Sequence, residues 1–336
     1  MDNRTDKGSV ALLWWRRVGP PLVTAGIFYY ILQHIPLPRL LGAFDAADLP
    51  QFFALMFPNS LFYFAWDTLV LACAIRWFHA PIRYSDLLPV RAVSYVVSLA
   101  NTNLARATVA YYLKRKLGDR FLVLSGTVIL LVLLEFTHLA LWAAAGMLAF
   151  YGHMPKGLFW APTGIVGFWF LFLLYVRGEV APWRVVTARV AQRWPGLRGR
   201  MRVREWSVMR TFVTAPLLRW VQIIALRAPM FFVALVFHWL GVKTFGMDLP
   251  FLQMMAFLPV IFMLAALPVT VAHLGTTQAA WIFFFRDYAA PEQLLAYSLA
   301  SHLTFMLARS ALGLLFLPRA WRDLVGPVRA LATKQV

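Results

Sequence analysis

Long apolar runs recur along the chain, and short polar links separate them. A helix needs about 20 apolar residues to cross the hydrocarbon core of a bilayer. The first run follows two arginines and has no small-residue cleavage site after it, so we expect a retained anchor and not a signal peptide. Six runs predict full membrane-spanning helices, at about residues 18–35, 52–78, 121–151, 158–176, 212–240 and 294–317.

Two further apolar stretches are interrupted. Residues 87–112 contain a polar interruption that begins at Asn101, and residues 251–285 are interrupted by Pro268 and Gly275. Basic residues flank the first stretch on both sides and are scarce on both sides of the second. Because basic loops stay in the cytoplasm, each stretch should enter and leave on one side of the membrane. We therefore expect two re-entrant helical hairpins.

The order of these segments is the same in both halves of the chain. Each half has two spans, one hairpin and one more span, and the second half runs in the opposite orientation. Residues 1–157 and 158–336 should therefore form an inverted repeat in an all-α polytopic membrane protein, with the binding site where the broken segments meet. Both chain termini are expected in the cytoplasm.

Composition agrees with this topology. The 336 residues are 61% hydrophobic and 14% charged, with a net charge of +18, whereas soluble domains carry about 25% charged residues. These values exclude a nucleic-acid-binding domain and a disordered chain, and the single Cys73 excludes an internal disulfide. The insert at residues 177–210 holds nine arginines; it is either a plain cytoplasmic loop or an interfacial helix that gathers anionic lipids.

Ionisable residues inside the apolar runs are the best candidates for a site, because each needs a partner or water at membrane depth. Arg106 leads, since a guanidinium can hold a phosphate through two hydrogen bonds. The other charged or ionisable candidates are Asp67, Glu135, Arg227 and His273. Polar neighbours in the two broken segments should add hydrogen bonds; they are Asn101, Asn103, Thr270, Thr276 and Gln278.

Catalytic motifs are missing from the sequence. It has no phosphate-binding P-loop, no zinc-protease helix motif, no nucleophile elbow and no closely spaced carboxylate pair. Its histidines are scattered over different segments, which disfavours a metal site. We expect a protein that is not an enzyme and uses no cofactor or metal.

Three short motifs resemble those of a known family. Arg76-Trp77 ends the second span, residues 267–280 read Leu-Pro-Val-Thr-Val-Ala-His-Leu-Gly-Thr-Thr-Gln-Ala-Ala, and residues 101–113 end in Ala-Tyr-Tyr-Leu. Together they are similar to the signatures of the flippase-like membrane domain found in lysylphosphatidylglycerol synthases and in stand-alone homologues. The family's Gly-Gly is Ala272-His273 here, its Arg-Glu is Thr277-Gln278, and its first Glu position holds Arg106.

This resemblance implies a divergent stand-alone member without the cytosolic aminoacyl-transferase domain. It implies a flippase or transporter that moves a lipid, with an anionic headgroup such as that of a phospholipid or polyprenyl phosphate, across or out of the bacterial cytoplasmic membrane. Membrane lipids are the expected partners, and nucleic acid is not. The sequence does not indicate an oligomeric state.

Two alternatives remain open at this stage. The chain could be a non-transporting membrane partner of a lipid or envelope biosynthesis complex. It could also be a membrane enzyme acting on a lipid-linked substrate, with Glu135 or Asp67 as acid or base.

Overall fold

The computed structural model describes residues 5–149, 206–266, 270 and 273–325, together with scattered positions between 160 and 193. In this part of the chain every regular element is a helix and no strand occurs. The all-α expectation is therefore confirmed for the described residues. Predicted features at residues 158–176 and 177–205 lie largely outside them.

The first half of the chain contains six described helices: α1 (Thr5–His34), α2 (Leu37–Asp45), α3 (Leu49–Phe78), α4 (Tyr84–Ala100), α5 (Thr102–Leu117) and α6 (Phe121–Ala149). After residue 205 come the short η4 (Ser207–Met209) and α10 (Arg210–Thr214), and then α11 (Leu217–Lys243), α12 (Phe251–Ala265), α13 (Thr276–Phe285) and α14 (Pro291–Val325). Helix starts follow local chemistry: Asp48 accepts a hydrogen bond from the Gln51 backbone N–H at the start of α3, at 3.0 Å.

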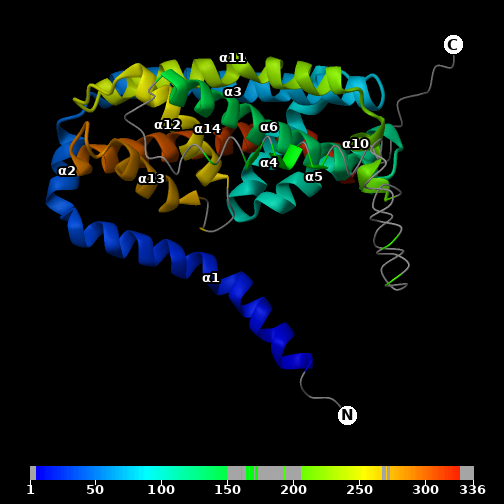
Figure 1. Ribbon diagram of the computed structural model, residues 1–336, viewed down its shortest axis with the longest axis horizontal. Helices are drawn as coiled ribbons and strands as arrows, with labels where there is room; N and C mark the ends of the chain where they lie inside the picture. The colour runs from blue at the N-terminus through cyan, green and yellow to red at the C-terminus, as the bar shows by residue number, and fades with distance from the viewer. Residues whose placement is uncertain are drawn as a thin grey trace.

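Four of the described helices are long and apolar enough to cross a membrane: α3, α6, α11 and α14. They correspond to the predicted spans at 52–78, 121–151, 212–240 and 294–317, with ends shifted by a few residues. The predicted first span falls within α1, which is not among these four. In Figure 1 the N-terminal part of α1 lies away from the other helices.

Both interrupted stretches form a helix, a break and a second helix. The first is α4 and α5, which meet at Asn101, and the second is α12 and α13, which are separated by residues 266–275. In each case the two helices contact one another. The breaks lie where the sequence pattern predicts them.

Two of the long helices, α3 and α11, pack against each other in antiparallel fashion. Helices α3 and α11 lie side by side along the top of Figure 1. The Trp66 indole donates to the Leu226 carbonyl at 2.7 Å near their centres. Gly241, near the end of α11, lies against Met56, near the start of α3, so the two helices run in opposite directions.

Each broken pair packs on the last long helix of the other half of the chain: α4 contacts α14, and α12 contacts α6. Both contacts depend on a glycine. A Cβ at Gly146 of α6 would lie 2.5 Å from the Ala256 Cα, and one at Gly313 of α14 would lie 2.8 Å from the Ala92 carbonyl oxygen. Close backbone approach between helices, which larger residues would prevent, is typical of packing inside membranes.

The apolar core is divided into two large clusters at opposite ends of the bundle. One gathers the start of α3, the end of α11 and most of α12 and α13 around Trp281 and Tyr297. The other gathers the end of α3, α5 and the start of α6 around Tyr112 and Leu124. The middle of the bundle lies between them, and there the polar side chains collect.

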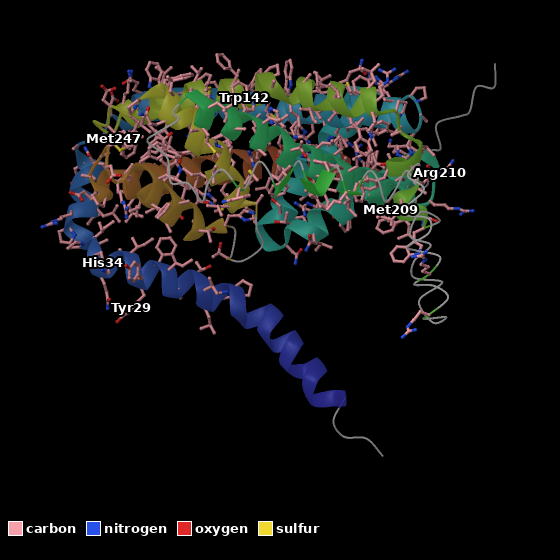
Figure 2. All side chains as sticks on the ribbon, in the orientation of Figure 1. Tyr29, His34, Trp142, Met209, Arg210 and Met247 are labelled. Carbon is pink, nitrogen blue, oxygen red and sulfur yellow. The ribbon has the colours of Figure 1, made fainter. Side chains whose placement is uncertain are left out.

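The two ends of the bundle carry opposite charge. Figure 2 shows Arg210 at the end beside α10 and Met247 at the opposite end. The end with Arg210, called the basic end below, also holds the cationic last turns of α3, α5 and α14, with Arg76, Lys114, Arg115, Lys116 and Arg322. At the opposite end the acidic residues outnumber the basic ones; the acidic ones are Asp45, Asp48, Asp248, Asp287 and Glu292, and the basic ones are Arg39, Lys243 and Arg286.

His79, just after α3, links several segments at the basic end through hydrogen bonds. Its Nδ1 lies 3.2 Å from Asp119 Oδ2, and its Nε2 lies 2.7 Å from the Thr127 hydroxyl. Thr127 in turn lies 2.8 Å from the Thr211 hydroxyl of α10. Burial lowers the pKa of His79 below its usual value, and the Asp119 carboxylate only partly offsets this.

Candidate functional site

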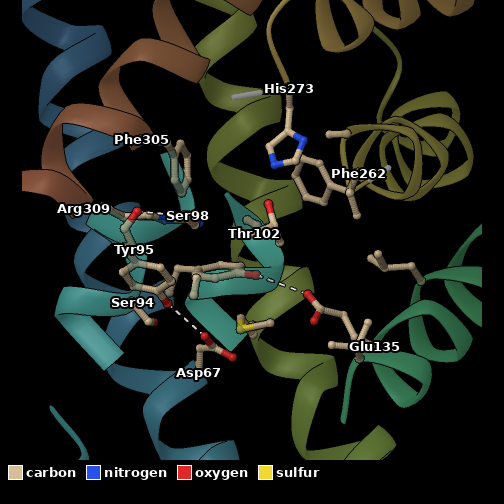
Figure 3. A pocket seen from close by; sticks show the side chains of 18 of the residues that line it. Asp67, Ser94, Tyr95, Ser98, Thr102, Glu135, Phe262, His273, Phe305 and Arg309 are labelled. Atoms are coloured by element: carbon tan, nitrogen blue, oxygen red, sulfur yellow. Dashed lines mark hydrogen bonds between the residues drawn. The ribbon is translucent and has the colours of Figure 1, made fainter. Parts of the chain in front are cut away.

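A cavity of about 390 Å³ lies in the middle of the bundle, between the two helix breaks. Side chains from all four long helices line it near their midpoints, and both broken pairs contribute residues beside their breaks. Figure 3 shows Ser98 and Thr102, on either side of the first break, and His273, from the second, turned toward the same space. The cavity is within the size range of small-molecule sites.

Asp67 of α3 anchors the charged side of the cavity. Its side chain is 3% exposed. Oδ2 accepts hydrogen bonds from Arg91 through Nε, at 2.7 Å, and through the neighbouring Nη2. The Tyr95 hydroxyl donates to the same oxygen at 2.8 Å, so three hydrogen bonds hold the carboxylate in position.

Arg227 of α11 lies between two carboxylates. Its Nη1 is 3.9 Å from Asp67 Oδ1 and 3.6 Å from Glu135 Oε2. Neither Nε nor Nη1 of this buried arginine has a hydrogen-bond partner among the described residues. The Glu135 side chain, 34% exposed, also accepts from the Tyr63 hydroxyl at 3.5 Å. This glutamate is the acid of the cluster that solvent or a ligand can reach.

Two more arginines of the cavity have no carboxylate within ion-pair distance among the described residues. Arg309 of α14 packs its guanidinium on the rings of Tyr63, Tyr95 and Phe305, at 4.5, 4.9 and 5.0 Å. Arg106 of α5 donates a long hydrogen bond of 3.5 Å to Asn103 Oδ1. The lining thus contains four guanidinium groups and two carboxylates, an excess of positive charge.

The first break is set by one residue. Asn101 has extended backbone angles, and its Oδ1 accepts from the backbone N–H groups of Asn103 and Leu104, at 2.8 and 3.0 Å. It therefore ends α4 and caps α5. Thr102 and Arg106 follow on the new helix and line the cavity.

The second break is held differently. His273 has a positive φ of 63°, which is rare for a residue other than glycine. Its carbonyl accepts from the hydroxyls of Thr276 and Thr277, at 3.1 and 3.0 Å. Gln278 accepts from the Gly275 backbone N–H at 2.7 Å. These bonds fix the backbone that carries the His273 side chain into the cavity.

Aromatic and histidine side chains form the wall on the side of the second break. The His238 Nδ1 lies 2.7 Å from the Tyr297 hydroxyl, and its ring stacks on Phe305 with an interplanar angle of 4°. His138 accepts from the Trp142 indole through Nε2 at 2.9 Å. Within the described ranges no three His, Cys, Asp or Glu side chains are grouped closely enough to hold a metal ion.

Comparison with models of protein families, with curated proteins and with solved structures finds no match for this chain. The family resemblance remains a prediction.

Half of the residues predicted from the sequence line this cavity. They are Asp67, Arg106, Glu135, Arg227 and His273. The others lie at the two breaks, where their side chains are engaged within the protein: Thr270 with Thr276 at 3.2 Å, Gln278 with Gly275 and with the Ser298 carbonyl, and Asn101 and Asn103 as described above. The structure brings the charged candidates together and assigns the uncharged ones to backbone support.

Three important residues are absent from the sequence prediction. Arg91 looks like part of a basic loop in the sequence, but it lies inside α4 and pairs with Asp67. Tyr63 and Tyr95 look like ordinary apolar positions, yet their hydroxyls bind the two carboxylates. The spacing of Arg91, Tyr95 and Ser98 on one helical face is a pattern that could have indicated the two residues of α4.

Proposed function

We propose that this chain is a membrane transporter or flippase that holds the anionic headgroup of a lipid in the central cavity. A basic, partly open cavity at the middle of four apolar helices suits a negatively charged group. The lipid tail would stay among the apolar helices or in the bilayer. The resemblance of residues 267–280 to flippase-like domains points to the same class.

Helix packing supports an inverted repeat. Helices α3, α4, α5 and α6 of the first half correspond in order to α11, α12, α13 and α14 of the second half. The principal contacts of one half recur between the corresponding helices of the other: α4 packs on α14 as α12 packs on α6, and α3 contacts α14 as α11 contacts α6. The short helices α2 and α10, which precede α3 and α11, likewise contact α14 and α6. Transporters with such repeats bind substrate where broken helices meet at mid-membrane, and the two pairs would then be re-entrant hairpins.

Charge supports an orientation. The basic end faces the cytoplasm under the positive-inside rule, and the acidic end faces outward. Helix α14 ends at the basic end, so the C-terminus would be cytoplasmic. Helix α1 leads to α2 at the opposite end (Figure 1), and a cytoplasmic N-terminus additionally requires α1 to cross the membrane. A bacterial cytoplasmic membrane is the proposed location.

The observation that carries the proposal is the pair of arginines, Arg106 and Arg309, that line the cavity beside the first break and have no carboxylate within 4.0 Å among the described residues. Cations at membrane depth are costly, so an unpaired one indicates a ligand or a pathway. An anionic headgroup would provide the missing counter-charge.

The test is lipid transfer in liposomes that contain the purified protein. Fluorescent phosphatidylglycerol, placed in both leaflets and quenched from outside by dithionite, should become fully accessible in proteoliposomes and remain half protected in empty ones. Arg106→Gln should slow the transfer, and Lys114→Gln, an exposed change on the same helix, should not. If half of the fluorescence stayed protected from dithionite in proteoliposomes of the wild-type protein, for every anionic lipid tried, the proposal would be wrong.

A further inference from the structure

The charges in the cavity divide into two sets. Asp67 and Glu135 are engaged by Arg91 and Arg227, at or within 3.9 Å. Arg106 and Arg309 have no such partner among the described residues. The cavity is therefore short of two negative charges, and the shortage is localised to two side chains.

We infer that the headgroup taken by this site is a phosphate monoester, the group that carries up to two negative charges. This inference rests on the proposed function and narrows it. A phosphodiester headgroup carries one negative charge on its phosphate. A monoester carries about −1.5 to −2 at neutral pH and offers three acceptor oxygens. Of these two headgroups, the monoester is the one whose charge matches both guanidinium groups.

The position of Arg309 fits this role. Its guanidinium packs on three rings, and its Nε is buried without a hydrogen-bond partner among the described residues. Aromatic contact fixes the direction of a guanidinium and leaves its N–H groups unused. In Figure 3 Arg309 lies beside Ser98, on the α4 side of the first break.

Arg106 approaches the same break from α5, one helical turn after Thr102. The Thr102 hydroxyl lines the cavity and makes no hydrogen bond within the described part of the chain. Two guanidinium groups and one hydroxyl thus provide the donors that three phosphate oxygens require. Val109 and Leu131 line the same cavity and offer an apolar path to the first carbons of a tail.

The experiment measures binding of the full-length protein in nanodiscs of phosphatidylcholine. One series contains increasing mole fractions of phosphatidic acid, a monoester, and the other contains phosphatidylglycerol, a diester. Native mass spectrometry counts the lipids retained by each protein. We expect retention of phosphatidic acid at mole fractions at least about tenfold lower, since one charge-assisted hydrogen bond corresponds to roughly that factor.

Arg106→Gln and Arg309→Gln should each weaken retention of phosphatidic acid by about 10-fold to 100-fold and should weaken the lower retention of phosphatidylglycerol by a smaller factor. Lys114→Gln on α5 and Arg322→Gln on α14 are the matched controls, because both remove an exposed cation from the same helix outside the cavity. These control variants should retain phosphatidic acid and phosphatidylglycerol as the wild-type protein does.

The outcomes separate this inference from the proposed function. Equal retention of the two lipids, reduced equally by the two cavity variants, overturns the monoester and leaves anionic lipid transport standing. Retention of neither lipid, together with failure of the liposome assay, overturns both. Displacement of phosphatidic acid by soluble glycerol 3-phosphate supports monoester recognition by the headgroup site alone, whereas displacement only by a lipid monoester supports a site that also holds the tail.

Discussion

The two helix breaks of this protein have the same architecture and different chemistry. The break at Asn101 adjoins Thr102, Arg106 and the charged network of Asp67, whereas the break before Thr276 adjoins His273 among aromatic rings. At the first break a single asparagine, Asn101, caps the following helix. At the second break a turn with a positive φ at His273 is held by several hydrogen bonds. The cavity between them is therefore charged on one side and aromatic on the other.

This difference gives the two sides of the cavity different electrostatic character. An anion is attracted to the side of the first break, where cations exceed carboxylates. The side of the second break has histidines and aromatic rings, so under the proposed function it would attract an anion less strongly. Under the proposed function, this uneven cavity would allow a bound substrate to leave.

The largest effect is expected from the charged side. Asp67→Ala would leave Arg91 and Arg227 without their shared carboxylate, and breaking a buried ion pair costs about 3–5 kcal/mol. The melting temperature of the detergent-purified protein measures the loss. Asp45→Ala, an exposed carboxylate on α2, is the control and should change the free energy of unfolding by no more than about 0.5 kcal/mol. Similar losses in the two variants would show that the network does not stabilise the fold.

The next effect tests whether the two breaks are packed alike. Gly146→Ala and Gly313→Ala each place a methyl against the backbone of a broken helix and should each cost about 1–3 kcal/mol. Gly42→Ala meets nothing within 4 Å inside helix α2, so it should be neutral or stabilising by about 0.4–1 kcal/mol. Thermal unfolding of the three variants in one detergent gives the comparison. A loss confined to one of the two glycines would contradict equivalent packing.

A smaller effect isolates the first break. Asn101→Ala removes the acceptor for two backbone N–H groups at the start of α5 and should cost about 1 kcal/mol. Asn101→Ser keeps a capping oxygen and should recover most of that loss. Hydrogen exchange of the first turn of α5 reports the change locally. Unchanged exchange in the alanine variant would mean that the cap does not hold this helix start.

The smallest effect lies outside the cavity, at the basic end. Because the pKa of His79 is lowered in the folded protein, the unfolded chain takes up the proton first as the pH falls below about 6.5. Stability should therefore be constant above that pH and should decline below it, until the folded form is protonated too. His79→Gln should reduce this decline, as seen in melting temperatures between pH 7.5 and 5. An equal decline in both proteins would assign the pH dependence to other groups.

Apolar run length and interruptions predicted much of this fold. The four long helices and both breaks depend on local pattern, which a single sequence contains. The predicted start of the first span, at about residue 18, was wrong, because α1 begins at Thr5 and continues through Pro20 and Pro21. The short helices α2 and α10 were also missed, since few residues specify them.

Charge within the apolar runs indicated residues that the fold gathers at one cavity, but it did not indicate their partners. Asp67, Glu135 and Arg227 stand out as ions in apolar runs, and the cavity contains all three. Their partners Arg91 and Tyr95 do not stand out, because ion pairing between α3 and α4 depends on tertiary packing. The uncharged candidates such as Gln278 support the backbone, a role that residue type alone does not distinguish from ligand binding.

The most direct test of the central claim is mass spectrometry of the lipids that co-purify with the protein. The account predicts an anionic, phosphate-bearing lipid enriched over its share in the membrane with the wild type and with Lys114→Gln, and lost from the double variant Arg106→Gln with Arg309→Gln. The same lipid profile in all three proteins, matching the bulk membrane, would contradict it.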